Sequence, residues 1–218
     1  MLVWIFVSDA ALKRETSAKA VMDDYKKLIT STKFLGYALG GSLATTAFYG
    51  FLGVASYIVL HQLHGTIHDV GVYLALVMVG IWLGTFSSTR LVSKISLNTM
   101  MALGSSISIG FSILLFGYTY FDYLTPWSVM IPVVGFCYGV GLTSPASLTN
   151  ALNVNPKIAG SASGLYGFLQ MAIGAICTSL TALGNNPAFS AACVLLAASL
   201  IAQFCYQMAR RVKVSHEC

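Results

Sequence analysis

Three histidines have the spacing of potential metal ligands. His61, His64 and His68 lie at i, i+3 and i+7, so that one helical face could carry all three, as in some zinc sites. Apart from Asp69, no cysteine or carboxylate has the spacing needed to complete such a site. We therefore interpret the histidines as an interfacial cluster in an outer loop, and we predict no metal ion.

A glycine-flanked serine run is the second chemical candidate. Residues 160–164 read GSASG, and intramembrane serine proteases likewise place a glycine-flanked nucleophilic serine on an inner helix. Such a serine needs a general base. The only histidine after His68 is His216, which lies beyond the last apolar segment. The sequence therefore predicts a protein that is not an enzyme. Of the three functions that the sequence suggests, an intramembrane serine protease ranks third.

Aromatic and amide side chains occur inside the long apolar segments. Polar groups at membrane depth usually face the bundle interior or a wet cavity, and aromatic walls with few polar anchors suit bulky apolar ligands. Tyr166 and Gln170 are four residues apart and so share one helix face. We predict a ligand cavity, with a structural role as the alternative for each residue. Its candidate lining residues are Phe48, Tyr49, Phe136, Tyr138, Tyr166 and Gln170.

Membrane-spanning helices must position these residues. Only 9% of the 218 residues are charged and 56% are hydrophobic, whereas soluble domains carry roughly 25% charged residues. A span needs about 20 apolar residues. The predicted fold is therefore an all-α membrane protein with six transmembrane helices in one bundle. The expected spans cover about 34–60, 70–89, 99–118, 127–148, 159–183 and 188–208.

The charged residues predict which side of the membrane each loop faces. All 12 Lys and Arg residues lie before the first span or after the second, fourth and sixth spans. The other three loops contain Asp69 and Asp122 instead. Because cytoplasmic loops are enriched in Lys and Arg, residues 1–33 are predicted to be a cytoplasmic linker and 209–218 a cytoplasmic tail. The basic residues form no continuous stripe, so nucleic acid is not an expected partner.

Glycine and proline mark expected contacts and distortions within the bundle. Gly160 and Gly164 are four residues apart, a spacing that lets helix backbones approach closely, so we predict that both pack against a neighbouring helix. Pro132 and Pro145 lie inside the fourth span, where each removes a backbone donor and is predicted to kink the helix. Pro145 is also expected to free carbonyls that line a wet opening.

Two segments resemble a known transporter family. Residues 141–182, GLTSPASLTNALNVNPKIAGSASGLYGFLQMAIGAICTSLTA, resemble the tenth and eleventh helices of the bicyclomycin- and chloramphenicol-resistance type of drug:proton antiporter, within the major facilitator superfamily. The run FSSTRLVSKIS at 86–96 resembles the family's loop between helices eight and nine, with Arg90 and Lys94 at its basic positions. The short first segment, residues 1–7, has the character of the end of a preceding helix.

The resemblance implies one six-helix half-bundle, equivalent to helices seven to twelve of the family. In this superfamily two such halves enclose a site at the membrane midplane. The implied function is multidrug efflux across the inner membrane, in which hydrophobic or amphipathic drug-like molecules are exchanged for protons, with the proton gradient as energy source and no cofactor. An N-terminal six-helix half or a second copy is the expected partner. The alternative is a non-transporting membrane subunit or fragment.

The topology can be tested at the C-terminal residue. Because the last basic cluster precedes it, Cys218 should lie in the cytoplasm. A membrane-impermeant thiol reagent applied to intact cells should therefore leave Cys218 unlabelled and should label it after the cells are opened. Labelling of Cys218 in intact cells would reverse the predicted orientation.

Overall fold

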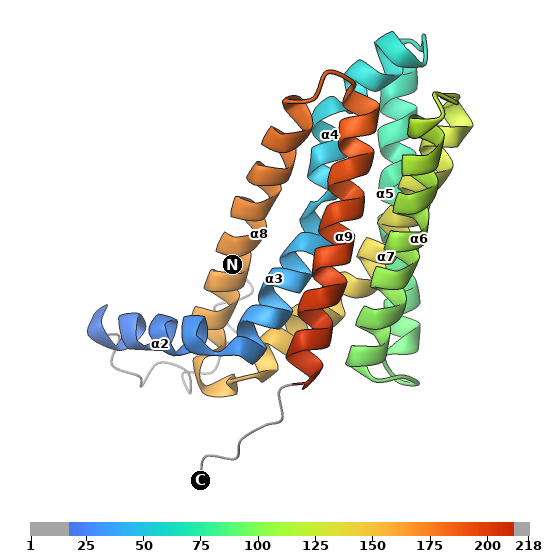
Figure 1. The fold of residues 1–218 in the computed structure, drawn as a ribbon. Coiled ribbons are helices and arrows are strands. Elements are labelled where there is room, and N and C mark those ends of the chain that lie inside the picture. Colours follow the sequence, from blue (N-terminus) through green and yellow to red (C-terminus); the bar gives the residue numbers. More distant parts are fainter. Residues whose placement is uncertain (1–17, 212–218) are drawn as a thin grey trace, which may run out of the picture.

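The computed structural model describes residues 18–211, and every regular element in that range is helical (Figure 1). The predicted first segment 1–7, His216 and Cys218 lie outside the described residues. The helices are α2 (Ala18–Thr30), α3 (Thr32–Thr46), α4 (Phe48–Tyr57), α5 (Ile67–Leu91), α6 (Leu97–Tyr120), α7 (Pro126–Asn153), α8 (Ala159–Ala182) and α9 (Pro187–Arg211).

Six helical stretches within residues 18–211 are long and apolar enough to cross a membrane. This confirms the all-helical fold with six candidate spans. The first stretch, Thr32–Gln62, combines α3, α4 and a π-helical turn at Ile58–Gln62. A 3-10 turn at Pro156–Ile158 leads into α8, and the other spans are single helices.

Polar capping residues set where several of these helices begin. At the start of α5, the Asp69 backbone N–H donates to the Thr66 hydroxyl at 3.3 Å and the Thr66 N–H donates to the Asp69 carboxylate at 2.7 Å. Thr125 and Ser128 form the same reciprocal cap on α7. Such caps satisfy the free N–H groups of a first turn. Consequently α5 begins three residues before the expected apolar span and includes Asp69.

Helix α7 lies between α5 and α6, and at its glycines the helix backbones are in direct contact. A methyl group on Gly84 of α5 would overlap the Tyr138 carbonyl, and one on Gly141 of α7 would overlap the Ile81 carbonyl. Gly104 of α6 and Gly139 of α7 meet in the same way on the other side of α7. Because lipid gives helices no hydrophobic drive to associate, close backbone packing of this kind holds membrane bundles together.

The predicted packing of Gly160 and Gly164 is wrong for the described bundle. Both residues are exposed, a methyl group on Gly160 would meet nothing within 4 Å, and one on Gly164 would meet only the Tyr25 hydroxyl at 3.5 Å. The four-residue spacing identified a helix face without bulky side chains, but it did not determine whether that face points into the bundle or away from it. The buried face of α8 carries Ala162, Tyr166, Gly174, Cys177 and Thr181.

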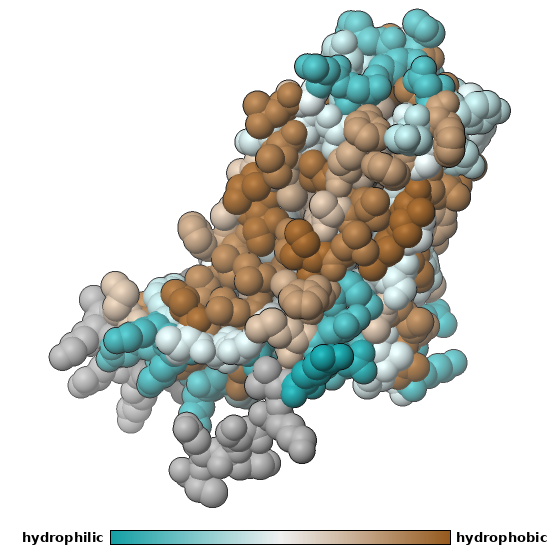
Figure 2. All heavy atoms as spheres, in the orientation of Figure 1, coloured by the Kyte–Doolittle hydropathy of each residue, from teal (hydrophilic) through white to brown (hydrophobic). Residues whose placement is uncertain are grey.

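The bundle is polar at both ends and apolar between them. Figure 2 shows teal residues at the two ends and a brown band across the face formed by α8 and α9. The described Lys and Arg residues belong to α2, the start of α3, the end of α5 and the turn after it, the 3-10 turn before α8 and the end of α9. Figure 1 shows these segments at one end of the bundle, which we call the basic end. Spans differ in how much of their apolar stretch is buried within the bundle. The buried share of residues is 17% in the span of α5 and 22% in that of α8, but 67% in that of α7.

The glycine contacts predict opposite effects of the same substitution at different sites. Gly84→Ala and Gly141→Ala should each lower the apparent unfolding temperature, because overpacking costs about 1–3 kcal/mol. Gly160→Ala should raise it slightly, since alanine favours a helix by about 0.5–1 kcal/mol. The measurement is thermal exposure of the buried thiols Cys137 and Cys177 to a thiol-reactive fluorophore. A silent Gly84→Ala beside a damaging Gly160→Ala would contradict this packing.

Candidate functional site

A cleft of about 460 Å³ opens on one side of the bundle. Its volume lies within the range of roughly 300–1,000 Å³ found for small-molecule sites. The walls come from α3, α4, α5, α7 and α8, so the first, second, fourth and fifth spans all contribute. The lining residues are Thr45, Thr46, Phe48, Tyr49, Ile81, Thr85, Val140, Ser144, Pro145, Leu148 and Gln170.

A break in the first span shapes one wall of the cleft. Helix α3 ends at Thr46 and α4 begins at Phe48. The Thr45 and Thr46 hydroxyls each donate at 2.7 Å to the carbonyl four residues earlier, and threonine bonding of this kind often bends a helix. The break places two threonine hydroxyls beside the rings of Phe48 and Tyr49, whose centroids are 4.5 Å apart.

An amide and a hydroxyl join the two sides of this wall. The Gln170 side-chain amide on α8 donates to the Thr45 hydroxyl on α3 at 2.8 Å. Behind them the hydroxyls of Tyr166 and Ser147 share a buried hydrogen bond of 2.9 Å between α8 and α7. Because buried polar groups are costly unless paired, these bonds fix how α8 sits against α3 and α7.

Pro145 exposes a backbone acceptor at the opposite wall. Proline has no N–H, so the Gly141 carbonyl loses its usual helical donor four residues later. The Thr85 hydroxyl of α5 donates to that carbonyl in a long hydrogen bond of 3.4 Å. Both Thr85 and Pro145 line the cleft. Pro132 is buried, and α7 continues as one helix through both prolines.

The six predicted lining residues divide into two groups. Phe48, Tyr49 and Gln170 line the cleft, and Tyr166 lies directly behind it. Phe136 is only 1% exposed and packs in the core, while the Tyr138 hydroxyl donates to Ser87 on α5 at 3.0 Å. Neither of these last two α7 residues lines the cleft.

Sequence reasoning missed the hydroxyl groups of the cleft. Thr45, Thr46, Thr85 and Ser144 all line it, but serine and threonine are common in membrane helices, so their presence alone does not indicate a ligand site. A signal was present, because two adjacent threonines in the middle of an uncharged span indicate a helix irregularity.

The predicted loop residues Arg90 and Lys94 lie at the basic end. Arg90 lies in the last turn of α5 with its guanidinium carbon 5.0 Å from the centroid of the Phe86 ring, a cation–π contact. Lys94 is exposed in the turn before α6. Arg90 is therefore held against its own helix, and a gating role for either residue stays a prediction.

The histidines do not share one helix face. His61 lies in the π-helical turn and stacks on Tyr57 at 4.4 Å, His64 has a positive φ of 53° in the loop, and His68 is in the first turn of α5. In the described part of the chain no three His, Cys, Asp or Glu residues are grouped to hold a metal ion.

The serines of the GSASG run have no histidine beside them among the described residues. They lie near the start of α8 at the basic end, whereas the described histidines lie at the opposite end of the bundle (Figure 1). The Ser163 hydroxyl donates to the Gly160 carbonyl of its own helix at 2.9 Å. Among residues 18–211 the run therefore has no histidine placed to act as its general base.

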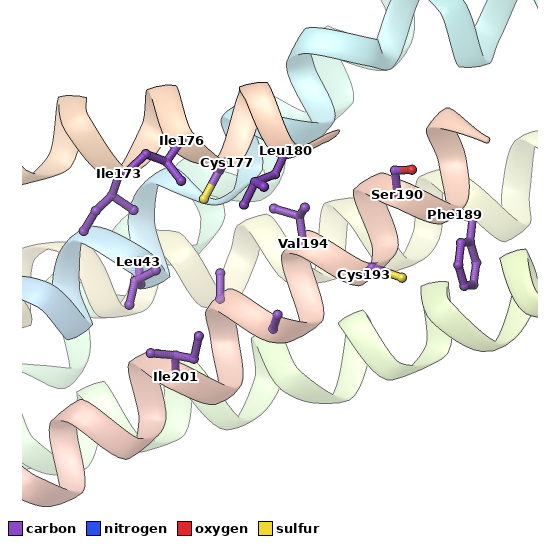
Figure 3. A pocket seen from close by; sticks show the side chains of 12 residues that line it. Leu43, Ile173, Ile176, Cys177, Leu180, Phe189, Ser190, Cys193, Val194 and Ile201 are labelled. Atoms are coloured by element: carbon purple, nitrogen blue, oxygen red, sulfur yellow. The ribbon is translucent and has the colours of Figure 1, made fainter. Parts of the chain in front are cut away.

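A larger groove of about 630 Å³ runs between α8 and α9, with Leu43 of α3 at its floor (Figure 3). Its lining is apolar except for Ser190 and two thiols, Cys177 and Cys193. Ligand sites combine an apolar wall with a few polar groups that fix orientation. The cleft meets that description better than the groove, so we assign the candidate site to the cleft.

The fold and the cleft define a multi-pass helical membrane protein with a ligand-sized opening on one side. No protein family model matches the chain. Over 148 residues the chain is 26% identical to a protein named bicyclomycin resistance protein homolog from Haemophilus influenzae. The match covers 68% of this chain and 37% of that relative. The chain therefore spans well under half the length of the curated relative it matches.

The cleft predicts a difference in thiol reactivity between two positions. In a chain whose only cysteines are Cys137 and one introduced by Gln170→Cys, the new thiol should react with a small water-soluble maleimide. Cys137 should not react, because it is fully buried. The measurement is labelling of the folded, detergent-solubilised protein followed by mass spectrometry of its peptides. Equal protection of both thiols would show that water does not reach position 170.

Proposed function

We propose that this chain is the C-terminal half of a multidrug efflux transporter of the major facilitator superfamily. Its substrates would be hydrophobic or amphipathic drug-like molecules, exchanged for protons across the inner membrane. The similarity to a bicyclomycin resistance protein homolog supports drug export. The single observation that carries the proposal is the cleft, which opens on one side of the bundle and is lined by two aromatic rings, an amide and several hydroxyls.

The cleft has the chemistry to hold such molecules. Tyr49 would offer a ring surface on which a flat apolar ligand stacks, and the Phe48 ring, which is only 7% exposed, packs beside it. Gln170 and the hydroxyls of Thr85 and Ser144 supply a small number of hydrogen-bonding groups that orient it. A second bundle facing the cleft would complete the enclosure, and an N-terminal six-helix half is the partner we propose.

Proton coupling in this proposal depends on that partner. Between residues 32 and 211 the sequence has only two carboxylates, Asp69 and Asp122. Asp69 caps the first turn of α5, and Asp122 lies in the loop between α6 and α7. Carboxylates that carry protons across membranes lie within the spans. The proton carrier would therefore come from the partner half, with the basic end of the bundle facing the cytoplasm.

The chain alone should not perform proton-coupled export. The test reconstitutes the purified 218-residue chain in liposomes with an imposed pH gradient and follows uptake of a fluorescent cationic drug. We expect no gradient-driven uptake until an N-terminal half with an intramembrane carboxylate is supplied, fused or separate. Uptake by the chain alone would contradict the need for a partner half. No uptake with the partner half present would favour a non-transporting subunit.

A matched pair of glutamine variants links transport to the cleft in the same assay. Gln170→Leu removes a polar anchor and should slow transport about fivefold to tenfold, the equivalent of roughly 1–1.5 kcal/mol for one hydrogen bond. Gln203→Leu is the control, because Gln203 lies on α9 outside the cleft, where it accepts a hydrogen bond from Ser105. Equal effects of the two substitutions on the transport rate would show that the transport site is not the cleft.

A further inference from the structure

Helix α2 runs sideways from the basic end of the bundle, past the start of α8, and is followed directly by α3 (Figure 1). Leu28 anchors it, since that side chain is only 1% exposed and belongs to the core beneath α3 and α8. The Tyr25 hydroxyl lies near Gly164 of α8. One side of α2 is therefore fixed to the bundle, at the level where the spans leave the apolar band.

Only part of the apolar face of α2 packs against the bundle. At about 100° per residue, Val21, Met22, Tyr25, Leu28 and Ile29 share an arc of roughly 120°. Leu28 is buried, and Val21 and Tyr25 are half-buried. Met22 is 69% exposed and Ile29 is 54% exposed. The described chain thus covers one half of the arc and leaves the other half open.

The end of the bundle that carries α2 is strongly basic. Lys26 and Lys27 are exposed on α2 itself. Among residues 21–211, this end of the bundle carries eight Lys and Arg residues against two carboxylates, Asp23 and Asp24. The eight are Lys26, Lys27, Lys33, Arg90, Lys94, Lys157, Arg210 and Arg211.

We propose that α2 is a membrane-surface helix. Its exposed apolar strip is covered by anionic phospholipid of the adjacent leaflet. Met22 and Ile29 enter the boundary between headgroups and acyl chains, and the lysines bind lipid phosphates. Two observations carry this: an exposed apolar strip on a helix that runs sideways from the basic end of the bundle, and a positive charge that complements anionic lipid. Interfacial helices combine these same features. The proposal does not depend on what the cleft binds.

Spin labels on the two sides of α2 test the proposal. The full chain, with its native cysteines replaced by alanine, is labelled singly at Met22→Cys or Ile29→Cys and reconstituted in vesicles of phosphatidylcholine and phosphatidylglycerol. Matched controls are Asp23→Cys and Thr30→Cys, two exposed positions on the polar side. Collision rates with oxygen, which concentrates in the bilayer, and with a water-soluble nickel chelate then report the depth of each label.

We expect the oxygen-to-nickel ratio at positions 22 and 29 to be on the order of tenfold higher than at positions 23 and 30. The ratio at position 22 should fall in vesicles without anionic lipid, and also in the Lys26→Gln, Lys27→Gln double variant. Equal ratios on both sides of α2 would overturn the proposal. Labels at 22 and 29 that are immobilised and shielded from both reagents would also overturn it, because a protein surface would then be the occupant.

Discussion

The lack of water around a membrane-spanning backbone is the constraint on which this structure depends. Every N–H and C=O group in the apolar layer must find a partner within the protein, so regular helices fill that layer and each irregularity needs a compensating side chain. The break after Thr46 has threonine hydroxyls bonded to carbonyls, and the carbonyl freed by Pro145 has Thr85. These compensating hydrogen bonds lie around the cleft, and the hydroxyls that form them provide much of its polarity.

The same constraint explains what the sequence could predict. Uncharged runs of span length had no stable alternative to helices, so the count of six followed from composition and from breaks such as Pro126 and Pro187. The direction in which a residue faces was harder to predict, because both faces of a membrane helix are apolar. Thus Gly160 and Phe136 were placed by spacing and residue type, but Gly160 faces outward and Phe136 packs in the core.

Polarity distinguishes the candidate site from the larger hollow. The groove between α8 and α9 exceeds the cleft in volume, but its only polar contributions are one serine hydroxyl and two thiols. The cleft combines an amide, several hydroxyls and two adjacent, mutually tilted aromatic rings over a smaller volume. A carboxylate is missing from both linings. The proposed division of labour follows from this difference: this bundle would recognise a ligand, and its partner would carry the proton.

The unequal burial of the spans has a consequence for how such a protein diverges. Helix α7 meets its neighbours through backbone contacts at Gly139 and Gly141, where any added atom overlaps a facing chain. Helix α8 keeps most of its surface free and still contributes Gln170 to the cleft. Substitutions accumulate where they cost little stability. In descendants of this sequence, α7 would therefore drift slowly, and new ligand preferences would arise first through changes on α8.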